Sequence, residues 1–234
     1  SVTFHQNRMV IGGSRDLPNR LWMSKSSDLF NFDWGKALDD NAIEFGILSD
    51  QVNAIKAVVS TRHLLVFTTG AEWMVSGEPL TPEKIQLKRQ TSVGIYADKI
   101  LAPQQIDGAT IFVSANGRQL REFLYTDVEQ AYQAKDLTIL ANDIIRRPRD
   151  VDYDKNDCVI YLVLEDGTVS CLTTYRTEDV NAWSSLKTQG EFLSVAVIGS
   201  DIYFCVKRNN GYFIEKMTDD YYSDCSICLT SGEP

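Results

Sequence analysis

The chain has 234 residues, a formal net charge of −9 and an isoelectric point near 4.8. This acidity argues against a protein whose main task is to grip phosphates, because nucleic-acid binders carry a basic excess or stripe. No stretch reaches the roughly 18 apolar residues that a membrane helix needs, and the first residues lack the apolar core of a signal peptide. Because the chain starts at Ser1 without an initiator methionine, we expect it to be a fragment of a longer protein.

Strand-like hairpins recur along the chain. The first pairs RMVIGG with RLWMSKS around Pro18 and Asn19, and the second pairs HLLVFTT with AEWMVSG. Three more follow as ATIFVSANGRQLREFLY, CVIYLVLEDGTVSCLTTY and IYFCVKRNNGYFIEKM. Asn-Gly and Asp-Gly between apolar runs are the strongest short-range hairpin signals, and they predict type I′ turns with positive φ. The predicted turn glycines are Gly70, Gly117, Gly167 and Gly211.

These four glycines are 47, 50 and 44 residues apart, and one further period back from Gly70 reaches the first hairpin. Most copies also have a strand-like run before the hairpin, such as IKAVVST, and an extended stretch after it, such as KIQLKRQTS. Four strands in about 45 residues are typical of a β-propeller blade. The sequence therefore predicts an all-β, β-propeller-like fold of about five four-stranded antiparallel blades. A non-repeating β-sandwich with several hairpins is the alternative.

We expect one propeller-like domain over residues 1–234, with blades at about 1–50, 51–95, 96–134, 148–190 and 191–234. One short helical insertion is predicted at 135–147, KDLTILANDIIRR. Its Leu137, Leu140, Ala141 and Ile144 would share one face, Asp136 could cap it, and arginines lie at its C-terminal end.

Few residues suggest chemistry. Cys225 and Cys228 form half a zinc site, but a closed site needs four ligands. Cys158 and Cys171 lie on opposite arms of one hairpin, which leaves a disulfide open, although small hydrophobic side chains are the simpler reading. The acidic stretch FDWGKALDDNAIEF reads as a solvated loop rather than a catalytic carboxylate pair, and YDKNDCV resembles only the start of a calcium loop. We therefore predict no catalytic residue, no metal and no cofactor.

Two groups of residues suggest contacts. Arg146, Arg147 and Arg149 form the one basic cluster, which either docks an acidic partner or complements the end of the predicted helix. The tryptophans Trp22, Trp73 and Trp183 recur near the hairpins, so we expect them to pack between sheets, with carbohydrate stacking as the alternative. No phosphate loop, G-x-S-x-G or H-E-x-x-H motif is present, and two histidines offer little for acid–base chemistry.

Several stretches resemble structural proteins of short-tailed phages, of the tail nozzle, tail tubular protein B or stabilisation-protein type. These stretches are NRMVIGGSRDLPNRLWMSKSSDLFNFD, QVNAIKAVVSTRHLLVFTTGAEWMVSG, VSANGRQLREFLYTDVEQAYQAKDLTILANDI, DVNAWSS and GYFIEKM. They are packing and turn motifs, so the resemblance implies a fold and a place in the virion rather than an active site. Family chains are usually longer on both sides.

The resemblance implies a non-enzymatic virion component that is assembled in the bacterial cytoplasm. It would join other tail or connector proteins and copies of itself, and it could line or flank a DNA passage without binding a specific nucleic acid or a membrane. An acidic surface suits such a passage, since carboxylates do not hold phosphates in transit. The alternative is a carbohydrate-binding or glycan-hydrolysing propeller used in host attachment.

Overall fold

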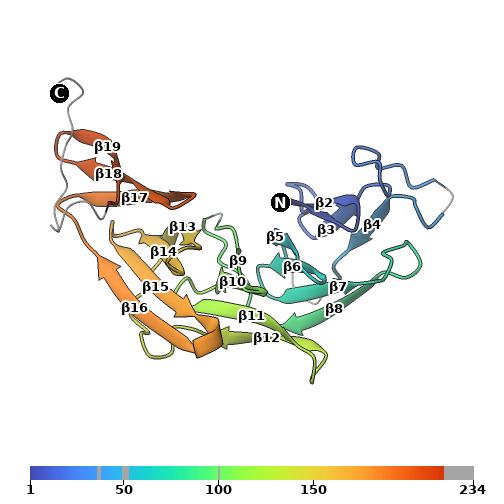
Figure 1. The fold of residues 1–234 in the computed structure, drawn as a ribbon. Helices are drawn as coiled ribbons and strands as arrows, with labels where there is room; N and C mark the ends of the chain where they lie inside the picture. Colours follow the sequence, from blue (N-terminus) through green and yellow to red (C-terminus); the bar gives the residue numbers. More distant parts are fainter. Residues whose placement is uncertain (36–37, 49–52, 100, 219–234) are drawn as a thin grey trace. The chain divides into compact units, whose positions relative to one another are not determined.

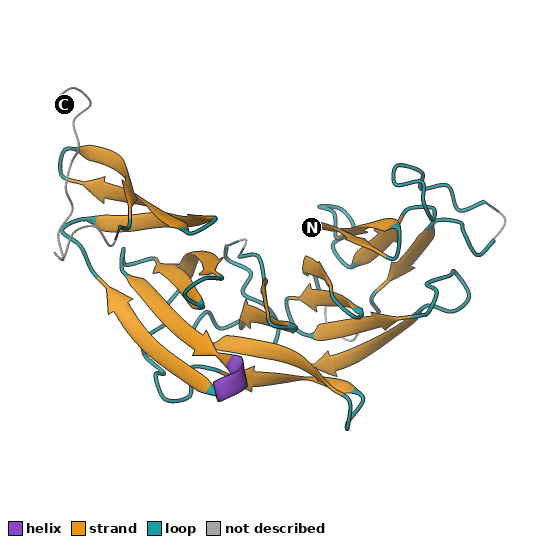
Figure 2. Cartoon of the chain, in the orientation of Figure 1, coloured by secondary structure: helices purple, strands orange, loops and turns teal. Residues whose placement is uncertain are grey.

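The computed structural model describes residues 1–35, 38–48, 53–99 and 101–218. These residues form five antiparallel sheets and almost no helix, as Figure 2 shows; the short 3₁₀ helix η1 (Arg176–Glu178) lies between β15 and β16. Each sheet is a meander in which strands consecutive in the chain are neighbours, so each hairpin follows directly from the local pattern. No helix in the described ranges is long and apolar enough to cross a membrane.

The strands are labelled in Figure 1. The first sheet holds β1 (Val2–His5), β2 (Arg8–Gly12), β3 (Arg20–Met23) and β4 (Ile43–Gly46). The second holds β5 (Ile55–Ser60), β6 (Leu64–Thr68), β7 (Glu72–Ser76) and β8 (Gln86–Thr91). The third holds β9 (Gln104–Ile106), β10 (Ala109–Val113), β11 (Leu120–Thr126) and β12 (Ala131–Asp136).

The fourth sheet holds β13 (Pro148–Asp154), β14 (Val159–Leu164), β15 (Val169–Tyr175) and β16 (Val180–Leu186). The fifth has three strands in the described range, β17 (Glu191–Ile198), β18 (Asp201–Arg208) and β19 (Gly211–Lys216). The chain divides into two compact units, Ser1–Leu140 with the first three sheets and Ala141–Pro234 with the last two. Closure of all five sheets into one domain stays a prediction.

The second sheet is apolar on both faces. Leu64, Leu65, Val66 and Phe67 of β6 are all fully buried. Because side chains alternate along a strand, Leu64 and Val66 pack with residues of the first sheet, whereas Leu65 and Phe67 pack with residues of the third. The continuous apolar run of β6 therefore corresponds to a strand that is covered on both faces.

A backbone hydrogen bond closes each junction between neighbouring sheets inside a unit. The amide of Ile55, the first residue of β5, donates to Pro18 O at 2.8 Å, and the amide of Ile95, before the third sheet, donates to Thr68 O at 2.9 Å. The amide of Phe192 likewise donates to Gly167 O at 2.9 Å. Pro18 and Gly167 lie in the hairpin turn between the second and third strands of the preceding sheet, and Thr68 is the last strand residue before the equivalent turn. All three donors carry buried apolar side chains.

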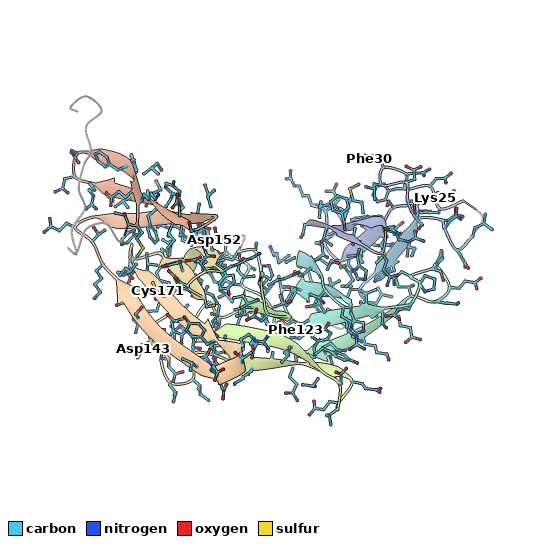
Figure 3. All side chains as sticks on the ribbon, viewed as in Figure 1. Lys25, Phe30, Phe123, Asp143, Asp152 and Cys171 are labelled. Carbon is cyan, nitrogen blue, oxygen red and sulfur yellow. The ribbon has the colours of Figure 1, made fainter. Side chains whose placement is uncertain are left out.

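Carboxylates close the junction of the fourth and fifth sheets further. The amide of Val195 on β17 donates to Asp150 Oδ2 at 3.0 Å, and the amide of Val197 donates to Asp152 Oδ2 at 2.7 Å. Figure 3 shows Asp152 on β13, beside β17. Since β17 pairs only with β18, these carboxylates satisfy amides on the edge of the sheet that would otherwise lack a strand partner.

The predicted helix at 135–147 is wrong. β12 continues through Asp136, whose Oδ1 accepts from the amide of Thr138 at 2.8 Å and starts a turn in place of a helix. Residues 137–147 form turns, and Leu140 is 97% exposed. Leu137 and Ile145 are the buried apolar residues of this irregular connection, and Ile145 does not belong to the predicted helix face.

The turn type was also predicted wrongly. The amides of Gly117 and Gly167 donate to Ser114 O and Leu164 O, and both glycines have positive φ, but Asn116 and Asp166 do not. In both loops a glycine follows a type I turn. The amide of Leu164 donates to Thr168 O and closes a three-residue loop, whereas the amide of Ser114 donates to Gln119 O and closes a four-residue loop. Gly211 also has positive φ, whereas Gly70 is not among the described glycines that do. At Gly70 the Thr68 hydroxyl closes the turn by donating to Ala71 O at 2.7 Å.

A substitution at Gly94 would test how closely the second and third sheets must approach each other. It has φ +74°, and a Cβ there would lie 2.3 Å from Thr69 O, a backbone atom of the preceding turn. Gly108 has φ +80° with nothing within 4 Å of a Cβ. We expect Gly94→Ala to lower the free energy of unfolding by about 3 kcal/mol or more, because conformational strain and a backbone clash add.

The matched control, Gly108→Ala, should cost only the left-handed conformation, about 1 to 2 kcal/mol. Urea denaturation followed by circular dichroism measures both variants. Equal losses in the two would show that the close approach at Gly94 does not hold the sheets together.

Candidate functional site

The structure brings the two histidines of the chain to one cavity, which the sequence analysis missed. His5 ends β1, directly before the first hairpin turn of the first sheet, and His63 lies in the β5–β6 turn, the first hairpin turn of the second sheet. The cavity has a volume of about 160 Å³ and is lined by His5, Gln6, Arg62, His63, Val75, Ser76, Gly77 and Glu78. The repeat could have predicted this proximity, because the first hairpin turns of adjacent sheets are equivalent and lie close together.

Each imidazole has a hydrogen-bonding partner. His5 Nδ1 lies 2.8 Å from Ser60 Oγ, and His63 Nδ1 lies 3.3 Å from the Tyr132 hydroxyl. Burial, and secondarily the neighbouring His63, lower the pKa of His5. Burial lowers the pKa of His63 as well, Arg62 adds to the effect and Glu78 opposes it. Both rings are therefore held in the neutral form at neutral pH.

Arg62, beside this cavity, has two neighbours of its own. Its guanidinium donates to Asp127 Oδ1 at 3.0 Å and lies 5.2 Å from the centre of the Tyr125 ring. The His63 ring is tilted against that of Tyr125 at 5.1 Å. The cavity is thus a small polar pocket between two sheets, with its cationic side chain already paired.

Glu72 is a buried carboxyl group that lies near the junction of the second and third sheets. It is fully buried on β7, and its Oε2 accepts from the Thr91 hydroxyl and from the amide of Val93 at 3.2 Å. Its Oε1 has no hydrogen-bond partner. Burial raises the pKa of this carboxyl despite the hydrogen bonds that stabilise its charged form. Glu72 therefore orients the segment that leads to the third sheet.

The predicted arginine cluster lies at the start of the fourth sheet. Arg146 and Arg147 are exposed in the connection before β13, where Arg146 pairs with Asp143 at 3.1 Å and Arg147 with Glu165 at 3.4 Å. Arg149, on β13, donates to Glu165 O at 3.3 Å. No helix precedes them, so only the docking interpretation of this cluster remains open.

The three tryptophans differ in their surroundings. Trp73 is buried between the first two sheets, and its Nε1 has no hydrogen-bond partner. Trp22 on β3 and Trp183 on β16 are half-buried. A packing role for Trp22 and Trp183 stays a prediction.

The cysteines in the described range are free thiols. Cys171 pairs with Tyr161 across the β14–β15 ladder, whereas Cys158 precedes β14, so no disulfide joins them. Burial raises the pKa of the Cys171 thiol to about 11, which makes it unreactive. Cys225 and Cys228 lie outside the described residues.

Two acidic residues of the stretch FDWGKALDDNAIEF form ion pairs with basic side chains. Glu44 binds Arg20 at 2.9 Å, and Asp40 binds Lys25 at 3.1 Å. The hydrogen bond from Lys25 is the main cause that lowers the pKa of Asp40. Within the part of the chain that the structure describes, no group of three or more His, Cys, Asp or Glu residues is arranged to hold a metal ion.

Together these features define an all-β, propeller-like protein. Solved structures with a similar fold include BamB from Moraxella catarrhalis, with a TM-score of 0.52 and 12% identity over 93% of this chain and 56% of that chain. Raptor from Chaetomium thermophilum is also similar, with a TM-score of 0.53 and 12% identity over 95% of this chain and 20% of that one. The chain thus spans about half of the first structure and a fifth of the second. At this identity the likeness concerns the fold alone.

The family is shown by a separate comparison. Residues 1–225 match the model of the bacteriophage nozzle protein family, and the chain belongs to that family. It is therefore a structural component of a phage tail, as the resemblance in the sequence implied. No curated protein matches the chain.

The histidine pair makes stability depend on pH. Because their pKa values are lowered in the folded state, the unfolded chain binds more protons, so the stabilisation is complete above pH 6.5 and is lost as pH falls. We expect His5→Gln/His63→Gln to remove part of the decline in melting temperature between pH 7.5 and about 5. Thermal melts at constant ionic strength measure this. An unchanged pH slope in the double variant would contradict it.

Glu72 should show the opposite dependence on pH. A raised carboxyl pKa means that its stabilising effect is complete below about 4.5 and falls as pH rises through the folded value. We expect Glu72→Gln, which keeps an acceptor without the charge, to be about 1 kcal/mol more stable than the parent at pH 8 and equal to it near pH 4.

Glu72→Ala is the matched comparison for this carboxyl. It leaves the Thr91 hydroxyl and the Val93 amide without their acceptor, so it should lose about 2 kcal/mol near pH 4. At pH 8 the loss should shrink to about 1 kcal/mol, because the parent itself then bears the cost of the buried charge. Denaturation at the two pH values separates burial of a charge from loss of the acceptor. Equal losses in Glu72→Gln and Glu72→Ala would refute this account.

Proposed function

We propose that this chain is a non-enzymatic module of a phage tail nozzle that acts through protein–protein assembly. In this role it associates with copies of itself and with neighbouring tail or connector proteins, and it lines or flanks the passage through which DNA leaves. The observation that carries the proposal is the family match over residues 1–225 on a chain of five small antiparallel sheets. Its place is the virion, after assembly in the bacterial cytoplasm.

The net negative charge supports a role beside a DNA passage rather than tight binding of DNA. The net charge of −9 repels phosphate groups, so DNA near this surface would be kept in motion instead of being held. The described arginine cluster does not offset this, because Arg146 and Arg147 are paired with Asp143 and Glu165. Specific nucleic-acid recognition needs side chains that can reach base edges, and a repelling surface does not favour that approach.

The proposal predicts that the chain is part of the particle and that particles need it. Mass spectrometry of purified particles of the phage that encodes it should detect its peptides. Deletion of the gene should give particles that fail to deliver DNA, and expression of the full-length gene in trans should restore delivery. The purified chain should not retard duplex DNA in gel-shift assays at low salt.

Absence of the chain from particles, or retardation of DNA by the chain, would count against the proposal. A glycan array covers the alternative role in host attachment. Glycan binding by a monomeric chain would favour that role over the nozzle module.

A further inference from the structure

The connection between β3 and β4 is held by a buried arginine. Arg8, 2% exposed, donates from its guanidinium to Ser24 O at 2.7 Å, Asn41 O at 2.6 Å and Asp39 O at 2.9 Å. A buried guanidinium is costly unless its donors are satisfied, and here the carbonyls at both ends of one connection satisfy them. Arg8 therefore fixes the two ends of this connection against the first sheet.

The connection is also ordered within itself. The amide of Lys25 donates to Asn31 O at 2.7 Å, and the amide of Ser26 donates to Asp40 O at 2.8 Å. The Lys25 ammonium binds the Asp40 carboxylate at 3.1 Å. Backbone and polar side chains thus help to set the shape of this segment, and its Phe30 and Trp34 side chains lie outside these hydrogen bonds. We call the described residues 25–35 and 38–41 the acidic loop.

Large apolar side chains of the acidic loop point into solvent. Phe30 is 86% exposed and Trp34 is 58% exposed, and Figure 3 shows Phe30 and Lys25 together on this loop. Asp28, Asp33 and Asp39 lie beside them in the sequence, and each is exposed. An ordered loop that exposes aromatic side chains has little entropy to lose on binding, and such residues are enriched among those that dominate interface energy.

The same chain offers a surface of the complementary chemistry. The Arg146 and Arg147 side chains are 68% and 75% exposed. Their ion pairs with Asp143 and Glu165 are exposed as well, so exchanging them for other partners costs little. A guanidinium can stack on a tryptophan or phenylalanine ring and bind a carboxylate with two hydrogen bonds. The aromatic and acidic groups of the loop are the groups that such arginines bind.

We propose that the acidic loop of one copy binds the arginine cluster, Arg146, Arg147 and Arg149, of a second copy of this chain. The inference rests on the proposed function, because it names the surface through which copies of the module associate. The two surfaces differ, so the contact is heterologous: each copy uses its loop on one neighbour and its arginines on another. Such contacts build rings or open chains rather than closed dimers.

The test uses sedimentation velocity of the 234-residue chain over a series of concentrations. The parent should self-associate, more weakly as salt rises. Phe30→Ala/Trp34→Ala removes the aromatic groups, and Arg146→Glu/Arg147→Glu reverses the basic surface. Each variant alone should show at least a tenfold higher dissociation constant. Val128→Ala, at an exposed apolar side chain in the β11–β12 turn, is the control and should associate like the parent.

Mixing the two defective variants gives the sharpest result. One still has intact arginines and the other an intact loop, so a mixture can form one native contact per pair. It should therefore give dimers and nothing larger, while each variant alone stays monomeric. Circular dichroism melts confirm that each variant is folded, and Arg146→Lys/Arg147→Lys keeps the charge if the reversal proves unstable.

Three results would overturn the inference: a parent that stays monomeric up to its solubility limit, a loop variant that associates like the parent, or a mixture without dimers. These outcomes are separate from failure of the proposed function. If the chain is present in particles but its self-association does not depend on either surface, only the proposed interface is refuted. A chain absent from particles would remove the function, whatever the association.

Discussion

The structure depends on the covering of small sheets that are apolar on both faces. A four-stranded meander such as β5–β8 cannot fold alone, because Leu64 and Val66 leave one face, and Leu65 and Phe67 the other, to be covered by neighbours. Burial of apolar surface provides the driving force but no direction. Direction comes from the amides of Ile55, Ile95 and Phe192, each bonded in or directly before a turn of the preceding sheet. Inside each unit, one backbone bond and one buried side chain thus mark how a sheet meets its neighbour.

This arrangement explains where the carboxylates that accept hydrogen bonds from backbone amides lie. Glu72 orients the segment that carries the Ile95 amide, and Asp150 and Asp152 satisfy amides on the edge of β17. All three carboxylates lie where a sheet edge or a connecting segment meets a neighbour, because backbone donors there lack a ladder partner. The cost of burying Glu72, and of half-burying Asp150 and Asp152, is partly offset by the donors that they satisfy. The histidine pair belongs to the same pattern, since it lies where the first turns of two adjacent sheets meet.

The sequence was sufficient for the fold class but not for every element. Apolar runs around the glycines predicted the hairpins and their period, since strand alternation and turn chemistry are local. The segment 135–147 was misread because Leu137, Leu140, Ala141 and Ile144 match a helical spacing, while the hydrogen bond from Thr138 to Asp136 that breaks it cannot be seen in a periodicity. The cavity at His5 and His63 was missed for another reason. Its residues are 58 positions apart, and only the packing of sheets brings them together.

The acidic loop shows how such a scaffold gains a surface without loss of stability. A strand of a sheet covered on both faces can vary little, because each of its side chains packs against a neighbouring sheet or strand. The β3–β4 connection is not constrained in this way, since Arg8 and the backbone fix its shape and leave Phe30 and Trp34 exposed. Interaction residues can therefore change there while the core stays intact. In the assembly that we propose, specificity would lie in connections such as this one, and the sheets would hold them in place.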